Sequence, residues 1–335
     1  MLTKLLQSRR VLLADGATGT NLFNAGLTSG DAPEMWNELH PERITDLHQG
    51  FVDAGADIIL TNSFGCNARR LMLHKLESRT RELNRIAAAL ARAVADKAGR
   101  PVIVAGSVGP TGDLFEPLGV MTEAVAVDVF AEQIAGLKEG GADVIWIETM
   151  SAFEEIRAAA QAARRCDMPF VLTASFDTAG RTMMGITPQD FAENAVGLEP
   201  VAIGANCGVG ASDLLVSVLS MSEAMPSAVI IAKGNCGIPK VTGDKVDYTG
   251  TPDLMAEYAR LAIDAGARII GGCCGTANEH LAAMRRAIDE HVPRARPDLT
   301  LITNATGPLV SPPPSAEMTE RAADRAAERR PRRRA

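Results

Sequence analysis

The sequence predicts a (β/α)8 TIM barrel with a disordered C-terminal tail. Eight short β-type runs alternate with longer, alanine-rich helical segments. Several helical segments end in a glycine that lies directly before the next run, as in Gly55-Ala56-Asp57, Gly141-Ala142-Asp143 and Gly266-Ala267-Arg268. Eight such alternations fit a closed barrel better than an open doubly wound sheet.

The eight expected strands are short and rich in Val, Ile and Ala. They are Val11–Ala14, Asp57–Thr61, Val102–Gly106, Val144–Ile147, Phe170–Ala174, Ala202–Ala205, Val229–Ala232 and Arg268–Gly271. The helical patterns between them include Pro41–Ala54, Arg69–Ala98, Thr122–Gly140, Ala152–Cys166, Pro188–Val196, Ala211–Ala224 and Pro252–Ala265.

The composition limits the class of protein. The chain has 335 residues, of which 46% are hydrophobic, and a formal charge of −7, so it can bury a sizeable core and has no general affinity for nucleic acid. No apolar run approaches the roughly 20 residues that cross a bilayer. The stretch Met1–Gln7 is too short and too polar for a signal peptide. We therefore expect a soluble cytoplasmic protein with neither DNA nor membrane as a partner.

The end of the chain differs from the rest. We expect the barrel to occupy residues 1–303 and a Pro/Arg-rich disordered tail to occupy residues 304–335. The stretch Ser311–Ser315 contains three prolines, and Arg329–Arg334 is strongly basic. A solubilising role fits this composition, and a contact with an acidic partner or RNA is the alternative.

Polar and thiol groups are concentrated in the segments that follow the expected strands. In a barrel these segments share one face, where active sites are found. They are Asp15–Thr20, Asn62–Gly65, Ser107–Gly112, Glu148-Thr149, Ser175–Asp177, Asn206–Gly208, Lys233–Gly237 and Gly272–Gly275. This one-sided distribution predicts an active site.

Six cysteines in a chain of this length do not form a disulfide framework. Cys273 and Cys274 are adjacent, and adjacent cysteines rarely bridge each other because the ring would be strained. Two thiols at a strand end instead suggest ligands for a soft metal ion. Cys207, which ends the sixth strand, is the expected third ligand, and Cys236 at the seventh strand is its rival.

Three thiolates around zinc leave a fourth position open, which is a catalytic rather than a structural arrangement. An exogenous thiol can occupy that position and be held as a nucleophilic thiolate at neutral pH. The predicted chemistry is therefore alkylation of a thiol. Cys66 and Cys166 are interpreted as ordinary thiols without a role at the metal.

The motifs together resemble the zinc-dependent homocysteine S-methyltransferase family, which includes betaine–homocysteine methyltransferase and the homocysteine domain of cobalamin-dependent methionine synthase. They are Asp15–Thr20, Thr61–Phe64, Gly106–Pro110, Asn206–Gly208 and Gly271–Gly275. The resemblance extends from about residue 8 to residue 292 and implies a barrel that binds one Zn²⁺ through Cys207, Cys273 and Cys274. It also implies homocysteine as the methyl acceptor and methionine as the product.

The resemblance also assigns the substrate contacts. Asp15 and Glu148 match the positions that hold the amino group of homocysteine, and two carboxylates suit an ammonium. The backbone amides of the turn that begins at Gly16 suit the substrate carboxylate. Capping of a helix at Thr18–Asn24 is the alternative role for Asp15. Three further residues are expected to order the site: Asn62, Ser107 and Asn235.

The methyl donor stays open between betaine and methylcobalamin carried by a separate corrinoid protein. A quaternary ammonium is usually enclosed by aromatic faces. In the animal betaine enzymes, tyrosines stand at the positions of Gly65 and Thr149, and Trp36 is one remaining candidate for an aromatic face. Most of the expected aromatic cage is therefore missing.

Two other functions compete with methyl transfer. A structural zinc site in a binding or scaffold protein would normally have four protein ligands. A thiol redox enzyme would normally carry a C-x-x-C motif, whereas Cys273 and Cys274 are adjacent. The zinc methyltransferase is the preferred interpretation, and the sequence does not indicate the oligomeric state.

Overall fold

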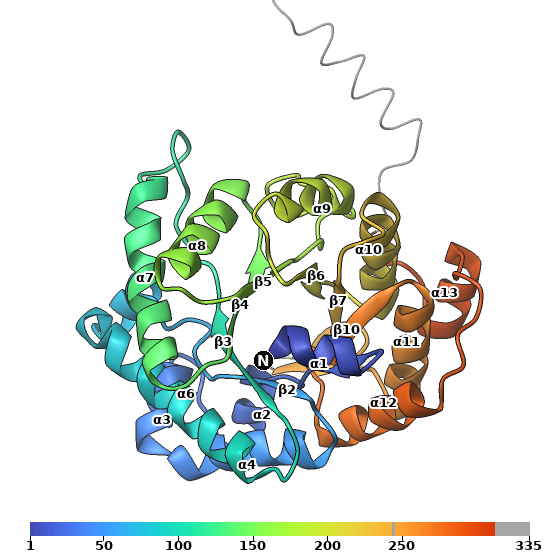
Figure 1. The fold of residues 1–335 in the computed structure, drawn as a ribbon, viewed down its shortest axis with the longest axis horizontal. Coiled ribbons are helices and arrows are strands. Elements are labelled where there is room, and N and C mark those ends of the chain that lie inside the picture. The colour runs from blue at the N-terminus through green and yellow to red at the C-terminus, as the bar shows by residue number, and fades with distance from the viewer. Residues whose placement is uncertain (243–244, 312–335) are drawn as a thin grey trace, which may run out of the picture.

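The computed structural model describes residues 1–242 and 245–311. Its main sheet has eight strands in the order β1-β10-β7-β6-β5-β4-β3-β2, and all neighbouring strands are parallel. A parallel bridge between Ala14 and Ile58 joins β1 to β2. The sheet therefore closes into the predicted (β/α)8 barrel, which Figure 1 shows nearly end-on.

The strands agree closely with the predicted runs. They are β1 (Leu12–Leu13), β2 (Ile58–Leu60), β3 (Ile103–Val108), β4 (Val144–Met150), β5 (Phe170–Ala174), β6 (Ala202–Cys207), β7 (Ile230–Gly234) and β10 (Ala267–Gly272). A separate antiparallel hairpin, β8 (Pro239–Thr242) and β9 (Lys245–Tyr248), follows β7 and was not predicted.

One long helix follows each barrel strand. These helices are α4 (Pro41–Asp53), α6 (Thr80–Lys97), α7 (Glu123–Glu139), α8 (Phe153–Arg165), α9 (Pro188–Val196), α10 (Ala211–Ala224), α11 (Pro252–Asp264) and α12 (Asn278–Glu290). The shorter helices are α1 (Leu2–Ser8), α2 (Gly19–Asn24), α3 (Trp36–Leu39), α5 (Ala68–Leu71) and α13 (Leu299–Thr306). The 3-10 turns are η1 (Pro33–Met35), η2 (Met72–His74) and η3 (Glu77–Arg79).

One helix prediction was wrong. The pattern Arg69–Ala98 was expected to be one helical segment, but the chain forms α5, two 3-10 turns and then α6. Lys75 lies between the turns with a φ of 59°, which a continuous helix cannot accommodate. The apolar periodicity was therefore correct only from Thr80 onward. The predicted cap glycines are confirmed, since Gly55, Gly141 and Gly266 have φ values of 101°, 97° and 103°.

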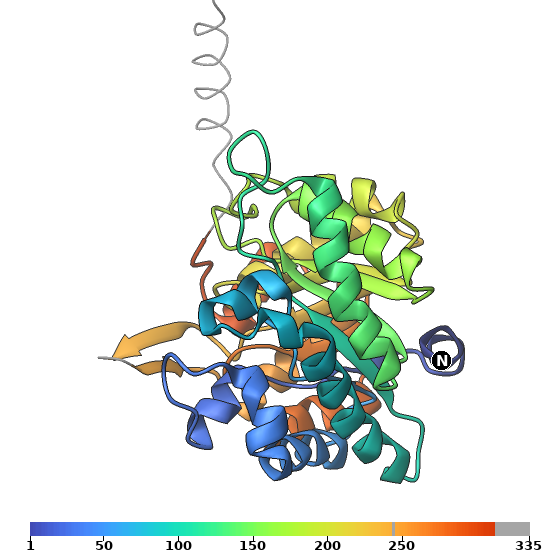
Figure 2. The same cartoon turned by 90° about the vertical axis from the view of Figure 1, so that its left-hand side faces the viewer.

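Two layers of apolar side chains hold the barrel together. Alternate strand residues such as Ile59, Val104 and Ile145 point outward and pack against the helices. Their neighbours, such as Ile58, Ile103 and Trp146, fill the interior together with Leu2, Leu5 and Leu6 of α1. Helix α1 therefore closes the amino-terminal end of the barrel, and the hairpin β8–β9 projects on the opposite side (Figure 2).

The last described residues lie against the barrel. Ile302 of α13 is buried in the outer core, and the α13 helix ends at Thr306. The Ser212 hydroxyl donates to the Gly307 carbonyl at 2.6 Å. Most of the tail predicted at residues 304–335, namely residues 312–335, lies outside the described residues, and the division of the chain at residue 303 stays a prediction.

None of the described helices is both long enough and apolar enough to span a lipid bilayer.

Candidate functional site

A cavity of about 440 Å³ opens at the carboxyl ends of the strands. It collects residues that lie at or just after the carboxyl ends of seven of the eight barrel strands. They include Gly16, Asn62, Ser107, Glu148, Thr149, Cys207, Lys233, Cys273 and Cys274. Thiols, carboxylates and an ammonium are thus brought to one cavity from distant parts of the sequence.

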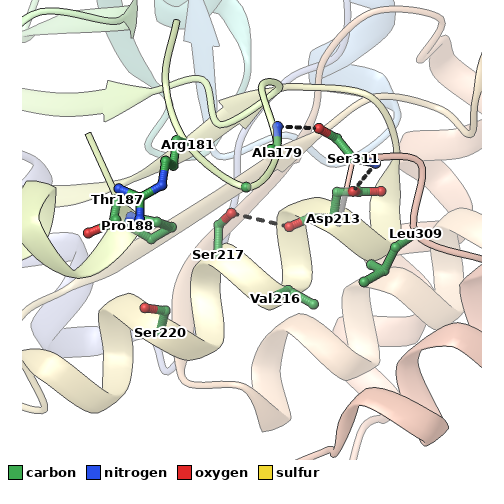
Figure 3. Close-up of a pocket in the computed structure, with 11 residues that line it drawn as sticks. Ala179, Arg181, Thr187, Pro188, Asp213, Val216, Ser217, Ser220, Leu309 and Ser311 are labelled. Carbon is green, nitrogen blue, oxygen red and sulfur yellow. Dashed lines mark hydrogen bonds between the residues drawn. The ribbon is translucent and has the colours of Figure 1, made fainter. Parts of the chain in front are cut away.

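A second cavity of about 250 Å³ lies between the β5–α9 loop, α10 and residues 309–311 (Figure 3). Its main polar groups already have partners. The Asp213 carboxylate accepts hydrogen bonds from the backbone N–H groups of Val310 at 3.0 Å and Ser311 at 2.8 Å. The Ala179 N–H donates to the Ser311 hydroxyl at 2.6 Å. These contacts fasten the segment after α13, and no thiol lines this cavity, so the first cavity is the candidate active site.

The sulfur atoms of Cys207, Cys273 and Cys274 lie within 4.8 Å of one another. The Cys207 and Cys274 sulfurs are 4.0 Å apart. Two sulfurs bound to one tetrahedral zinc at about 2.3 Å would be about 3.8 Å apart. The three thiols therefore fit a single zinc ion without a large rearrangement, and their donor set suits that metal.

Special backbone geometry brings the thiols together. Cys207 has a φ of 62°, a left-handed conformation that is uncommon for a residue with a side chain. The Cys273 N–H donates to the Gly234 carbonyl at 2.6 Å. Asn235 spans the two halves of the cluster, because its amide donates to the Gly208 carbonyl at 2.5 Å and its oxygen accepts from the Cys274 N–H at 3.0 Å. Asn235 therefore connects the loop after Cys207 to the Cys274 backbone, and its predicted role in ordering a substrate site stays a prediction.

The electrostatics of the cluster favour a bound cation. Hydrogen bonds from Cys207 and Cys273 lower the pKa of the Cys274 thiol. The hydrogen bonds between Cys207 and the other two thiols raise the pKa of Cys207. One thiolate can thus form readily, but a second and third would add like charges at short distance. A divalent cation would remove this penalty.

The remaining cysteines lie apart from this group. Cys236 is buried and is not among the three clustered sulfurs, although its N–H donates to the Cys274 carbonyl at 2.9 Å. Cys66 is buried in a small cluster with Leu71 and Leu83. Cys166 ends α8 on the outside of the barrel. The geometry thus favours Cys207 over Cys236 as the third ligand.

Asp15 is fully buried beneath the cavity and does not line it. One carboxylate oxygen accepts from the Leu60 N–H at 2.6 Å, and the other lies 3.3 Å from the Lys233 ammonium. Burial raises the pKa of Asp15 to about 6, although Lys233 opposes the shift. Thr18 rather than Asp15 precedes α2 as its N-cap, so the alternative capping role of Asp15 was wrong.

Glu148 lies at the cavity wall near the end of β4, with 7% of its surface exposed. The Ser107 hydroxyl donates to one of its carboxylate oxygens, and the predicted role of Ser107 in ordering a substrate site stays a prediction. Burial raises the pKa of Glu148 to about 7, and Lys233 opposes this shift too. A carboxylate in this setting binds an ammonium strongly, because there is little water to compete.

Asn206 fixes the segment beside Glu148. Its side-chain oxygen accepts from the Thr149 N–H at 2.8 Å and from the Thr173 hydroxyl at 2.7 Å, and its amide donates to the Thr149 hydroxyl at 2.8 Å. Thr149 has a φ of 61°, so these bonds hold a strained residue in place. Asn206 thereby links the segment after Glu148 to the neighbouring Cys207, a candidate metal ligand.

Asn62 and Gly16 also line the cavity, but their groups are partly engaged. The Asn62 amide donates to the Pro33 carbonyl at 2.8 Å, which anchors the segment before α3. Gly16 approaches Thr276 so closely that a Cβ would lie 2.6 Å from its carbonyl oxygen. This close approach explains why glycine occupies position 16. A role of this turn in binding the substrate carboxylate stays a prediction.

Among the residues that the structure describes, the aromatic side chains do not form a cage at the cavity. Trp36 is buried among Leu22, Leu27 and Ile44, with the Arg43 guanidinium 4.8 Å from its ring centre. It therefore packs rather than faces the cavity. In the part of the chain that the structure describes, Phe64 is the aromatic residue that lines the cavity.

Sequence reasoning missed two residues at the site. Lys233 is buried at the end of β7. Burial tends to lower the pKa of Lys233, but Asp15, the Cys273 thiol and Glu148 outweigh it and raise the pKa, so the ammonium stays charged. Tyr248, at the end of β9, lies beside the Cys274 thiol and lowers its pKa. The position of Lys233 at the end of an apolar strand was a signal that could have identified it. Tyr248 could not be identified in this way, because it belongs to the hairpin that was not predicted.

Comparison with known proteins places this geometry in a family. Residues 12–288 match the profile of the family described as homocysteine S-methyltransferase. The chain is 32% identical over 302 residues to a methionine synthase of Mycobacterium tuberculosis (strain ATCC 25618 / H37Rv), covering 84% of this chain and 25% of that protein. It is 31% identical over 323 residues to a methionine synthase of Mycobacterium leprae (strain TN), covering 89% of this chain and 26% of that protein. The chain thus spans about a quarter of the length of these curated relatives.

A solved structure shows the same fold. The metallated form of the homocysteine methyltransferase MmuM from Escherichia coli superimposes with a TM-score of 0.72 at 24% identity, covering 85% of this chain and 99% of that one. The family profile extends from β1 to α12 and includes all three clustered cysteines. This chain therefore belongs to the homocysteine S-methyltransferase family.

Proposed function

We propose that this chain transfers a methyl group to the thiol of homocysteine and so forms methionine. The observation that carries the proposal is the convergence of three thiols and a reachable carboxylate on one cavity. Family membership supports the acceptor, and the similarity to proteins named methionine synthase supports the product.

In the proposal, Cys207, Cys273 and Cys274 hold one zinc ion. Three sulfur ligands leave the fourth tetrahedral position for the substrate sulfur. When bound there, zinc would lower the pKa of the homocysteine thiol and keep its sulfur as a nucleophilic thiolate. A fourth protein sulfur is not within reach in the described chain, because Cys236 lies outside the cluster, and this disfavours a purely structural zinc site.

The chain's own residues would orient the substrate. The carboxylates of Glu148 and Asp15 provide negative charge for the ammonium of homocysteine, and Ser107 and Asn206 hold Glu148 and its neighbour in place. The turn that begins at Gly16 lies at the same cavity and is proposed to bind the substrate carboxylate. Fixing both ends of the amino acid would direct its sulfur toward the three thiols, so that the donor methyl is attacked in line.

The donor is proposed to be either betaine or methylcobalamin on a partner protein. Two observations favour the partner protein. Gly65 and Thr149 supply no aromatic face, and Trp36 is covered by Arg43 and apolar side chains. A trimethylammonium group would therefore meet Phe64 alone among the aromatic residues that line the described cavity.

A donor screen tests the proposal. Zinc-loaded full-length protein would be incubated with homocysteine and, separately, with betaine, S-methylmethionine or methylcobalamin, and methionine would be measured. We expect methionine with betaine or methylcobalamin, loss of the product in Cys274→Ala, and its retention in the matched Cys236→Ala control. Failure to form methionine with any methyl donor, in protein that binds zinc, would refute the proposed reaction.

A further inference from the structure

The barrel also has a basic cavity, at the end opposite the three thiols. This amino-terminal cavity has a volume of about 570 Å³ and shares no lining residue with the thiol cavity. Its lining comes mainly from the segments that precede β1, β2 and β3 and from α12. Helix α1 lies at the same end of the barrel (Figure 2). The charged residues that line the cavity are Arg9, Arg10, Asp57, Arg100, Arg285 and Asp289.

Three guanidinium groups surround the buried carboxylate of Asp57. Only 1% of the Asp57 side chain is exposed, and its Oδ1 forms an ion pair with Arg9. Arg285 Nη1 lies 3.2 Å from Oδ2, and Arg100 Nη1 lies 3.5 Å from Oδ1. The Leu13 N–H also donates to Oδ2 at 3.0 Å. This one carboxylate therefore balances only one of three positive charges.

Arg100 is held in place although its charge is poorly compensated. Its Nη2 donates to the carbonyl oxygens of Val52 at 2.8 Å and Ala56 at 2.9 Å. Its Nη1 is buried and has no hydrogen-bond partner among the residues that the structure describes. Burial lowers the pKa of Arg100, Asp57 opposes this shift, and the neighbouring guanidinium groups add to it. Because arginine stays protonated in proteins, an excess of positive charge remains here that a bound anion would stabilise.

Two further arginine side chains keep N–H donors for a ligand. Arg9 uses Nη1 for its ion pair, and its Nε and Nη2 have no partner in the described part of the chain. The Arg10 side chain is exposed and makes neither a hydrogen bond nor an ion pair within residues 1–242 and 245–311. The Arg268 guanidinium donates to the carbonyl oxygens of Arg9 at 3.0 Å and Arg10 at 2.9 Å. Both side chains therefore extend from a fixed backbone.

The charges that line the cavity indicate the kind of ligand. Four arginines and two aspartates give the lining a net charge of +2, with His291 counted as neutral, whereas the whole chain carries −7. Guanidinium groups bind tetrahedral oxyanions through paired N–H donors. We infer that the amino-terminal cavity binds a phosphate dianion, either as inorganic phosphate or as the phosphate group of a small metabolite. Arg9 and Arg10 contact the phosphate, and Arg100 and Arg285 supply further positive charge.

A purely structural role explains less of this cluster. Arg9 and Arg285 already pair with the two oxygens of Asp57, so closing the end of the barrel requires neither the charge of Arg100 nor that of Arg10. The inference goes beyond the proposed methyl transfer. It does not depend on that proposal, because the two cavities have no residue in common.

Titration calorimetry on the full-length protein tests the inference with inorganic phosphate, at an ionic strength kept constant with sodium chloride. We expect one site per chain with a dissociation constant below about 1 mM. At about 100 times that constant, phosphate should raise the melting temperature by about 2–4 °C. Glycerol 3-phosphate would be titrated in parallel. Tighter binding of this ester would identify a phosphorylated metabolite as the ligand, and weaker or equal binding would identify the free anion.

Variants locate the binding site. Arg10→Gln should weaken phosphate binding about 5- to 20-fold, because charge-assisted hydrogen bonds are lost. The double variant Arg9→Gln/Arg10→Gln should abolish the binding. Arg85→Gln is the matched control, since Arg85 is exposed on α6 and lies outside the cavity lining, and it should change the affinity by less than about twofold. If the double variant does not fold, Arg10→Gln alone is sufficient, because Arg10 has no side-chain partner to lose in the described chain.

Three results would overturn the inference. The first is the absence of saturable phosphate binding to the wild-type protein. The second is an equal loss of affinity in Arg10→Gln and Arg85→Gln, which would show that phosphate binds elsewhere. The third is tighter binding of succinate than of phosphate, which would show that the cavity selects carboxylates.

Discussion

Replacing Asn206 by alanine should loosen the site without removing a thiol or a carboxylate. The Asn206 side chain is 1% exposed and makes three hydrogen bonds, two to Thr149 and one to Thr173. Alanine would leave the Thr149 N–H and the buried Thr173 hydroxyl without these partners. At about 1 kcal/mol for each lost bond, the free energy of unfolding should fall by about 3 kcal/mol.

The consequence should extend to substrate binding. Thr149 is held at a φ of 61°, and Asn206 provides the bonds that compensate this strain. Without them the Glu148 carboxylate would no longer be fixed against the cavity. We therefore expect weaker binding of homocysteine, with zinc content unchanged, because the sulfur atoms themselves remain.

Urea unfolding and thermal scans would measure the loss of stability. For a domain of this size, about 3 kcal/mol corresponds to a decrease of about 4–5 °C in melting temperature. Asn194→Ala is the matched control, since Asn194 is exposed on α9 and its amide donates only to the Asp190 carbonyl of its own helix at 2.8 Å. The control should change stability by less than about 0.5 kcal/mol. Equal effects of the two substitutions would refute the role assigned to Asn206.

Three further predictions concern pH, the metal and the C-terminal segment. Burial lowers the pKa of His48 to about 4, so the unfolded chain binds a proton at a higher pH than the folded chain does. The free energy of unfolding should therefore fall by up to about 3 kcal/mol as the pH decreases from about 6.5 to about 4. Urea titrations of His48→Phe should lack this dependence on pH. Cys236→Ser should retain one zinc per chain by elemental analysis and Cys207→Ser should lose it; the reverse would exchange their roles. The free energy of unfolding should be about 2 kcal/mol lower for a chain truncated after Asn304 than for one truncated after Ser311, because the shorter chain leaves Asp213 without two N–H donors. Equal stabilities of the two chains would contradict this.

Much of the fold could be predicted because local and global signals agree. Each barrel strand is a short apolar run, and glycines such as Gly55 and Gly141 both end a helix and turn the chain into the next strand. The break before α6 could not be predicted, because the left-handed conformation of Lys75 follows from packing and not from its residue type. The hairpin β8–β9 was not predicted, because its strands lie outside the barrel and lack a long apolar run.

The site was predictable to the extent that it depends on strand ends. Cys207 and Cys273 are 66 positions apart, but the barrel topology places both at the same face, so their proximity follows from the fold class. The pairing of Asp15 with Lys233 could not be deduced in this way. It depends on side-chain rotamers and on two backbone carbonyls, whose positions become known only once the barrel has closed.

The proposed reaction depends on zinc coordination by three protein sulfurs, with one position left for homocysteine. X-ray absorption at the zinc edge of the full-length, zinc-loaded protein counts these ligands directly. We expect three sulfur ligands and one oxygen or nitrogen ligand before homocysteine is added, and four sulfur ligands at about 2.3 Å afterwards. Four sulfur ligands in the absence of homocysteine, or an unchanged number after its addition, would contradict the claim.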